Sequence, residues 1–302
     1  MAEDEKIVIR SLLYFDIFNY PITTAEIIRF APVGISESIQ GTIDNLVAQR
    51  KIFRLGEFYS LQDNNFLAER RISGNKLAEE KMTVAKKYAK IISFFPFVRA
   101  VMLSGSISKG YMDDKSDIDY FIITEKNRLW ISRTLLILFR RIFLFNSHKN
   151  FCTNYFVDKD NLEIIEKNIF TAIEFSTLVQ MFDQQATEAF NHSNRWIKDF
   201  LPNEKEKSVE LKKDKTFTKT LIEGAISLIV PDQLNHWLKN RTISYWKKKY
   251  GNELSQADFE IAFKSTEGIS KSHPQFFQKK VLGFFDQKIN RYEIEHGLDL
   301  SL

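Results

Sequence analysis

Two short apolar segments near the middle of the chain constrain its fold most. The first, VRAVMLSGS, starts at Val98 and ends in Gly105-Ser106, and the second, DIDYFIIT, starts at Asp117. Apolar runs of this length that are bounded by turn-forming residues are typical of buried strands. The intervening segment, SISKGYMDDKS, is rich in small and polar residues, which favours a loop. The sequence therefore predicts two neighbouring strands joined by a polar loop.

The segments around these strands predict helices packed on a sheet. A helix is expected from Asn127 or Arg128 through Phe145, followed by a third strand, FCTNYFVD. Residues 66–94 have the pattern of one long charged helix, in which Ser73-Gly74-Asn75 is a candidate break. Strands that alternate with helices indicate an α/β core. Residues 162–302 show no convincing strand pattern and are expected to be helical.

The first 65 residues predict three short helices and a hairpin. The first helical pattern ends near Asn19-Tyr20-Pro21, and Thr23 or Thr24 can cap a second helix. A third helix is expected from Ser36 or Ser38 through Gln49, and IFRL-GE-FYSL has the pattern of two strands around a turn. In order and spacing alone, this arrangement resembles the winged helix-turn-helix superfamily.

The charge of the expected third helix bears on whether this unit binds DNA. The segment SESIQGTIDNLVAQR carries Glu37 and Asp44 and has Arg50 as its one cation. A helix that enters the major groove usually carries more positive charge, because it must approach phosphates. Packing or protein contact is therefore favoured, and nucleic acid stays open as a partner.

Composition places the chain among soluble globular proteins. Its apolar content is 44%, and its formal charge of +4 permits phosphate-bearing partners without requiring them. The longest apolar run, Leu135 to Phe145, contains Arg140 and Arg141 and is too short to span a bilayer. The single cysteine, Cys152, excludes a disulfide within the chain, and the start MAEDEK lacks the features of a signal peptide. We therefore expect a cytoplasmic protein with no membrane partner.

The first candidate site element is Gly105-Ser106. Glycine lets the backbone turn tightly and approach a phosphate without a Cβ in the way. Ser106 adds a hydroxyl and a backbone N–H, and the exposed amides of the next residues can face an anion. Lys109, one turn further on, is a candidate for a charge that binds a triphosphate, although a solvated surface lysine is the commoner case.

The second candidate element is the pair Asp117 and Asp119. Residues two apart in a strand point to the same face, roughly 7 Å apart along the strand. Two unpaired carboxylates on one face repel each other unless a cation lies between them. Mg²⁺ suits such a pair, because it takes carboxylate oxygens while keeping waters and substrate phosphates as its other ligands.

Together these elements resemble the DNA polymerase β-type nucleotidyltransferase superfamily. The segment VMLSGSISKGYMDDKSDIDYFII is similar to the pattern of its small bacterial and kanamycin nucleotidyltransferase-like members, in which Gly-Ser leads into Ser-Asp-x-Asp on a strand. The resemblance implies that Gly105 and Ser106 hold a nucleoside triphosphate and that Asp117 and Asp119 are catalytic and bind Mg²⁺. It covers about Val98 to Val157, a fifth of the chain.

The implied fold is α+β with four parts. Residues 1–65 form a winged-helix-like domain, 66–96 a linker helix, 97–160 a nucleotidyltransferase core with a mixed sheet, and 161–302 a helical C-terminal domain. The implied reaction moves a nucleoside monophosphate from the triphosphate to an acceptor and releases pyrophosphate. The acceptor can be a small molecule, a protein or an RNA, and small members of the superfamily serve in toxin–antitoxin and protein-modifying systems.

One departure from the superfamily pattern keeps a second function open. The superfamily usually places a third acid, the base for the acceptor hydroxyl, on the next strand, where this chain has Asn154. An amide cannot take a proton from a hydroxyl, and Asp158 at the end of that strand is a candidate substitute in a less good register. The alternative is therefore a non-catalytic winged-helix regulator with a weakened, nucleotide-sensing site.

Overall fold

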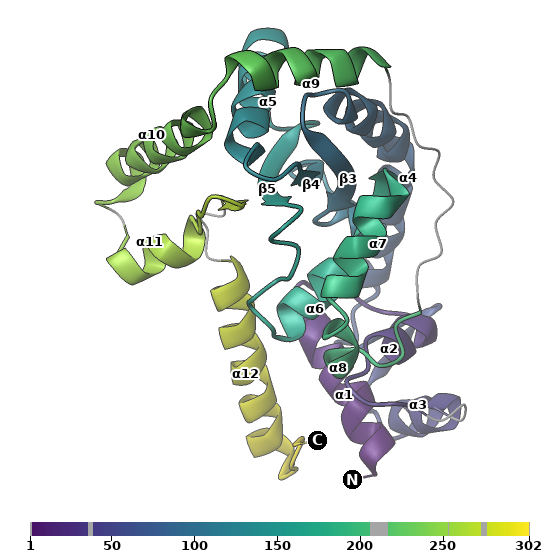
Figure 1. The fold of residues 1–302 in the computed structure, drawn as a ribbon. Helices are drawn as coiled ribbons and strands as arrows, with labels where there is room; N and C mark the ends of the chain where they lie inside the picture. The colour runs from purple at the N-terminus through teal and green to yellow at the C-terminus, as the bar shows by residue number, and fades with distance from the viewer. Residues whose placement is uncertain (1, 36–38, 206–216, 253, 273–276, 302) are drawn as a thin grey trace.

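The protein has an α+β fold built around one mixed five-stranded sheet (Figure 1). The computed structural model describes residues 2–35, 39–205, 217–252, 254–272 and 277–301. The strands of this sheet lie in the order β6-β3-β4-β5-β7. They are β3 (Val98–Ser104), β4 (Asp119–Thr124), β5 (Cys152–Asp158), β6 (Val179–Phe182) and β7 (Ile269–Lys271).

The central strands β3, β4 and β5 confirm the three strands predicted from the apolar runs. β3 and β4 are antiparallel, whereas β4 and β5 are parallel and are joined through α5 (Leu129–Phe143). A parallel pair needs such a crossover, because its second strand must start at the same edge as the first. The expected helix between these strands is therefore present and begins just after Arg128.

The two faces of the sheet are buried in two different clusters, as the two-residue period of a strand requires. Met102, Phe121 and Ile123 belong to one cluster, which also contains residues of the N-terminal helices. Val101, Tyr120 and Ile122 belong to the other, together with residues of α5 and of α4 (Asn65–Ser93). Alternate residues of β3 and β4 thus face opposite layers.

The N-terminal region has the expected three helices followed by a hairpin. These elements are α1 (Glu3–Asp16), α2 (Thr24–Arg29), α3 (Ile39–Ala48), β1 (Phe53–Leu55) and β2 (Phe58–Ser60). Thr23 caps α2 in a capping box with Glu26, as the sequence indicated. The expected caps of the third helix, Ser36 and Ser38, lie outside the described residues.

Helix α4 is continuous, so the break expected at Ser73-Gly74-Asn75 is wrong. Gly74 has a packing role instead, because a Cβ there would lie 2.1 Å from the ring of Tyr111. The Gly74 carbonyl also accepts a hydrogen bond of 3.1 Å from the backbone N–H of Met112. The glycine thus lets the loop after β3 lie directly on the helix.

The C-terminal region contains two strands that the sequence did not indicate. β6 and β7 are short edge strands that pair antiparallel with β3 and β5, so backbone hydrogen bonds rather than an apolar pattern define them. The helices of this region are α6 (Ile169–Ser176), α7 (Gln184–Ser193), α8 (Ile197–Phe200), α9 (Phe217–Ile229), α10 (Asp232–Tyr250), α11 (Gln256–Ala262) and α12 (Phe277–His296). Across the described ranges, no helix is both long and apolar enough to cross a bilayer.

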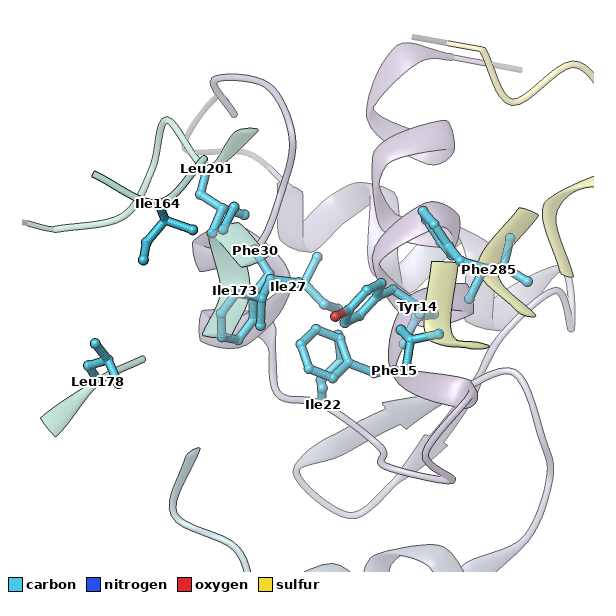
Figure 2. Close-up of a cluster of buried hydrophobic side chains, with 14 of the residues drawn as sticks. Tyr14, Phe15, Ile22, Ile27, Phe30, Ile164, Ile173, Leu178, Leu201 and Phe285 are labelled. Carbon is cyan, nitrogen blue, oxygen red and sulfur yellow. The ribbon is translucent and has the colours of Figure 1, made fainter. Parts of the chain in front are cut away.

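The N-terminal helices share their core with the sheet domain (Figure 2). Tyr14 of α1 packs edge-on against Phe285 of α12, with ring centroids 5.4 Å apart. Ile27 and Phe30 lie in the same buried cluster as Ile173 of α6. The expected boundary near residue 65 is therefore crossed by one continuous hydrophobic core, and the two chain ends lie near each other (Figure 1).

Candidate active site

The turn after β3 is built around a glycine that contacts the first residue of β4. Gly105 has a φ of +67°, a left-handed conformation that glycine adopts without strain. A Cβ at this position would lie 2.5 Å from Oδ2 of Asp119. The register of the two strands, in which Ser104 faces Asp119, creates this approach. The structure therefore brings the two predicted halves of the site together.

Ser106 has two polar groups that bind no other described residue, and one that does. Its carbonyl accepts hydrogen bonds from the backbone N–H groups of Lys109 (3.0 Å) and Tyr111 (3.2 Å), around the short 3₁₀ helix η1 (Ile107–Lys109). In the described part of the chain, neither the N–H nor the Oγ of Ser106 has a hydrogen-bond partner. Ser106 is partly exposed, so both groups can donate to an anionic ligand.

The two predicted carboxylates lie on one side of the chain, although only one of them is in the strand. β4 begins at Asp119, and Asp117 lies two residues before it, outside the strand. Between and after them, Ile118 and Tyr120 are completely buried on the opposite side. The expectation that Asp117 lies within the strand is therefore wrong by two residues, while the expected alternation holds.

The electrostatic environment of Asp119 disfavours its charge. The pKa of this carboxyl is raised from 3.8 to about 6, chiefly by burial, and the neighbouring charges of Asp117 and Glu174 act in the same direction. Hydrogen bonds with Cys152 and Asn154 act in the opposite direction and lower the pKa. A bound cation would relieve the repulsion, because it favours the ionised form of all three carboxylates.

Asn154 occupies the place where a third acid was expected. Its Nδ2 donates a hydrogen bond of 3.1 Å to Oδ1 of Asp119. The pairing of β4 with β5 shifts register here, since Tyr120 faces Thr153 but Phe121 faces Tyr155. Asn154 is the extra residue of this bulge, and bulges commonly re-aim a side chain next to a site. The amide holds Asp119 in place and offers no proton acceptor.

The structure does not bring Asp158, the candidate substitute for the missing acid, to the site. The parallel register pairs Cys152 with Asp119 but Asp158 with Thr124, at the other end of the two strands. Asp158 is buried, and its Oδ1 accepts hydrogen bonds from Asn161 Nδ2 (2.7 Å) and the Asp160 N–H (3.1 Å). These bonds give it the role of a turn residue.

Lys109 lies in the site but is bound to protein groups. Its Nζ is 2.8 Å from Oε1 of Glu174 and donates a hydrogen bond of 3.1 Å to the Gly105 carbonyl. Sequence reasoning missed Glu174, which α6 places beside Asp119. The available signal was one acid in the apolar segment IFTAIEFSTL, where a buried face would otherwise be uninterrupted.

Basic side chains lie near Asp117 on the other flank of the site. Nη1 of Arg140 is 3.1 Å from Nδ1 of His148. Burial lowers the pKa of His148, the charges of Arg140 and Lys249 lower it further, and Asp117 raises it. Arg140 and Lys249 thus place positive charge around His148, close to Asp117.

The oxygen ligands of this site suit a Mg²⁺ ion that is also bound by the phosphates of a substrate. Asp117 and Asp119 supply carboxylate oxygens, and the Gly105 backbone lies directly against the Asp119 carboxylate. In the residues that the structure describes, no group of three or more His, Cys, Asp or Glu side chains is arranged to hold a metal. Mg²⁺ is commonly bound by one or two carboxylates together with waters and phosphates. The pair therefore fits a magnesium ion that arrives with a triphosphate.

The chain was compared with protein-family models, with curated proteins and with solved structures. No family model, no curated protein and no solved structure matches it. The chemistry of the site itself therefore carries the functional argument.

Proposed function

We propose that the protein is a Mg²⁺-dependent nucleotidyltransferase. It transfers a nucleoside monophosphate from a nucleoside triphosphate to an acceptor and releases pyrophosphate. The observation that carries this proposal is the contact between the Gly105 turn and Asp119, whose carboxyl also lies close enough to Asp117 for that charge to raise its pKa. A phosphate-binding turn and a metal-binding carboxylate pair at one point are what phosphoryl-group chemistry requires.

The residues of the turn would bind and orient the triphosphate. Gly105 lets the phosphates approach the backbone, and Ser106 donates its N–H and hydroxyl to phosphate oxygens. Asp117 and Asp119 would hold Mg²⁺, and Lys109 lies close enough to the turn to bind the phosphate tail. The magnesium ion supplies positive charge that offsets the charge of the triphosphate and of the leaving pyrophosphate.

The acceptor then reacts at the α-phosphorus. A hydroxyl oxygen of the acceptor forms the new bond to phosphorus, the bond from phosphorus to the bridging oxygen of the β-phosphate breaks, and pyrophosphate leaves. Holding both reactants in line lowers the barrier by reducing the entropy that a bimolecular step must lose.

The experiment uses each ribonucleoside triphosphate labelled at the α-phosphate, with Mg²⁺ and the purified protein. Mg²⁺-dependent pyrophosphate release, together with label on water, on the protein or on an added acceptor, supports the proposal. The matched variant is Asp119→Asn, which keeps the shape of the side chain and removes its charge. Equal pyrophosphate release by this variant and the wild type would refute the proposal.

A second candidate function is a nucleotide-sensing regulator. Two contacts favour it. In the first, the Asn154 amide donates a hydrogen bond to the Asp119 carboxylate. In the second, the Tyr20 hydroxyl donates a hydrogen bond of 3.2 Å to the Lys109 carbonyl. The second contact ties the N-terminal unit to the candidate phosphate-binding turn. Nucleotide binding that changes DNA or protein binding, without pyrophosphate release, would favour the regulator over the enzyme.

A further inference from the structure

The ion pair between Lys109 and Glu174 lies directly beside the Gly105-Ser106 turn, where the nucleoside triphosphate (the donor of the transferred group) would bind. Its two charged atoms are 2.8 Å apart, and both side chains are only partly exposed. The same ammonium group donates to the carbonyl of Gly105, the residue whose Cα approaches the Asp119 carboxylate. One cation therefore connects the phosphate-binding turn to a carboxylate on α6.

Glu174 is a third carboxylate of the site, supplied by a helix instead of a strand. Its charge acts on Asp119, where it raises the pKa of that carboxyl in the same direction as Asp117 does. At rest Lys109 offsets part of this third charge, because its ammonium group lies 2.8 Å from the Glu174 carboxylate. Whatever removes Lys109 from the pair leaves Glu174 as a free carboxylate.

The proposed reaction needs a group that takes the proton of the acceptor. Asp117 and Asp119 would be bound to Mg²⁺, the Asn154 amide cannot accept a proton in this way, and Asp158 lies at the far end of its strand. Glu174 is the carboxylate near Asp119 that has no part in holding the metal. An adjacent carboxylate is a common general base.

A bound triphosphate would compete with Glu174 for Lys109. Several phosphate oxygens at the Gly105-Ser106 turn offer an ammonium group more charge than one carboxylate does. The Lys109 side chain already reaches the carbonyl at the centre of that turn. The ammonium group therefore needs only a small movement to exchange its partner.

We propose that Lys109 exchanges Glu174 for the phosphates of the donor, and that the released Glu174 accepts the proton of the acceptor hydroxyl. This inference rests on the proposed function. As the acceptor oxygen bonds to the α-phosphorus, its proton moves to a carboxylate oxygen of Glu174. The bond to the bridging oxygen breaks, and the electron pair leaves with pyrophosphate.

The exchange is tested by calorimetric titration with magnesium tripolyphosphate, a probe that needs no base or acceptor. Lys109→Met should weaken binding by about tenfold or more, whereas Glu174→Gln, which frees the lysine, should tighten it by roughly threefold to tenfold. The double variant should bind like Lys109→Met alone. An unchanged or weaker affinity in Glu174→Gln contradicts the exchange. The exchange is also contradicted if Glu174→Gln tightens tripolyphosphate binding equally in the Lys109→Met background. In that case the gain would come only from the loss of the negative charge of Glu174.

The proton transfer is tested by pyrophosphate release from Mg²⁺-bound ribonucleoside triphosphates, with water as the acceptor. Glu174→Gln should bind the donor at least as well as the wild type yet release pyrophosphate about a hundredfold more slowly, and Glu174→Asp should restore part of the rate. Equal rates in Glu174→Gln and the wild type would overturn the role of Glu174. A wild type that binds the donor but releases no pyrophosphate would overturn it as well.

The two proposals fail in different ways. If the wild type shows no Mg²⁺-dependent binding of tripolyphosphate or nucleotide, both the proposed function and this inference are refuted. If the wild type binds nucleotide and releases pyrophosphate, but Glu174→Gln changes neither, only the inference about Glu174 is refuted. The melting temperature of each variant, which we expect within a few degrees of the wild type, shows that the fold is retained.

Discussion

Two regions approach the Asp119 carboxylate from opposite sides, and they differ in what they leave open. On one side the Gly105 backbone lies against Oδ2, and the adjacent Ser106 keeps an N–H and a hydroxyl without partners among the described residues. On the other side the Asn154 amide donates to Oδ1, and the Cys152 thiol shares a hydrogen bond with the same carboxylate. The β3 side is thus prepared for a ligand, whereas the β5 side is closed by the protein.

The two sides of Asp119 therefore have different roles in the proposed chemistry. In the proposed function the β3 side would bind the triphosphate, and its geometry depends on a residue without a Cβ. The β5 side fixes Asp119 but contributes no acid, so a proton acceptor must come from another element. Glu174 on α6 is the residue that the arrangement of charges supports for that task.

The largest effect is expected from Gly105→Ala, which tests the open side. The new Cβ would collide with Asp119 and force the residue from a φ of +67°, so we expect a loss of stability of about 2–3 kcal/mol. Donor affinity should fall by about a hundredfold or more, measured by calorimetry with Mg²⁺-bound nucleotide.

Gly110→Ala is the matched control for that change. Gly110 has a similar φ of +71°, but nothing lies within 4 Å of a Cβ built on it. We expect a loss of only about 1 kcal/mol from the backbone strain and nearly unchanged donor binding. Equal losses of donor affinity in the two variants would contradict the special role of the Gly105 contact.

The next effect tests the closed side through Asn154→Asp. This change removes the hydrogen bond to Asp119 and adds a carboxylate beside it. Without metal, the free energy of unfolding near pH 7 should fall by roughly 1–3 kcal/mol, because two like charges then lie in contact. Mg²⁺ should restore more stability in this variant than in the wild type, as measured by thermal melting with and without the ion.

Asp158→Asn is the control for Asn154→Asp, since Asp158 faces away from the site along the same strand. It should lose stability through its turn hydrogen bonds and show the Mg²⁺ response of the wild type. If Asp158→Asn changes the stabilisation by Mg²⁺ more than Asn154→Asp does, then position 158 and not position 154 lies near the metal, which contradicts this arrangement.

The pH dependence of stability gives a smaller effect. Because the pKa of Asp119 is raised from 3.8 to about 6 in the folded protein, the native state binds this proton more tightly than the unfolded state. Its contribution to stability is therefore full below pH 4 and is lost as the pH rises through 6.

Asp119→Asn should remove that loss. Without metal, the variant should be more stable than the wild type above pH 6 by about 2 kcal/mol, and the difference should shrink toward pH 4. Chemical denaturation at several pH values, in the absence of divalent cations, measures the free energy of unfolding of the variant and of the wild type. A variant that is least stable relative to the wild type at high pH would show the opposite sign.

The smallest effect is expected from Tyr20→Phe, which removes the hydroxyl that binds the Lys109 carbonyl. The ring and its edge-on contact with Tyr111 remain, with centroids 5.5 Å apart. We expect a loss of about 1 kcal/mol in stability and a few-fold weaker donor binding. Donor binding that drops as far as in Gly105→Ala would mean that the N-terminal unit controls the turn.

Much of this site could be predicted from the sequence because its elements are local. Gly105-Ser106 and Asp117-Ile118-Asp119 each adjoin an apolar strand, and strand length and alternation are short-range properties. The α+β class and the helix–strand order around Asp119 followed from the same patterns. The contact of Gly105 with Asp119 depends on the register of β3 and β4, which the sequence alone did not specify.

The parts that sequence reasoning missed depend on long-range pairing. β6 and β7 have four and three residues, too few for a clear period, and they exist as strands through β3 and β5. The parallel register of β4 and β5 moved Asp158 away from the site. Glu174 reaches it only because α6 packs on the sheet face that carries Asp119, which no local pattern encodes.

The most direct measurement is a calorimetric titration of the wild type with each of the four ribonucleoside triphosphates, with and without Mg²⁺, beside Asp117→Asn and Asp119→Asn. We expect Mg²⁺-dependent binding of at least one triphosphate, with an affinity reduced by about a hundredfold or more in both variants. Binding that needs no Mg²⁺, or that survives both substitutions, would contradict a site built on the Gly105 turn and this carboxylate pair.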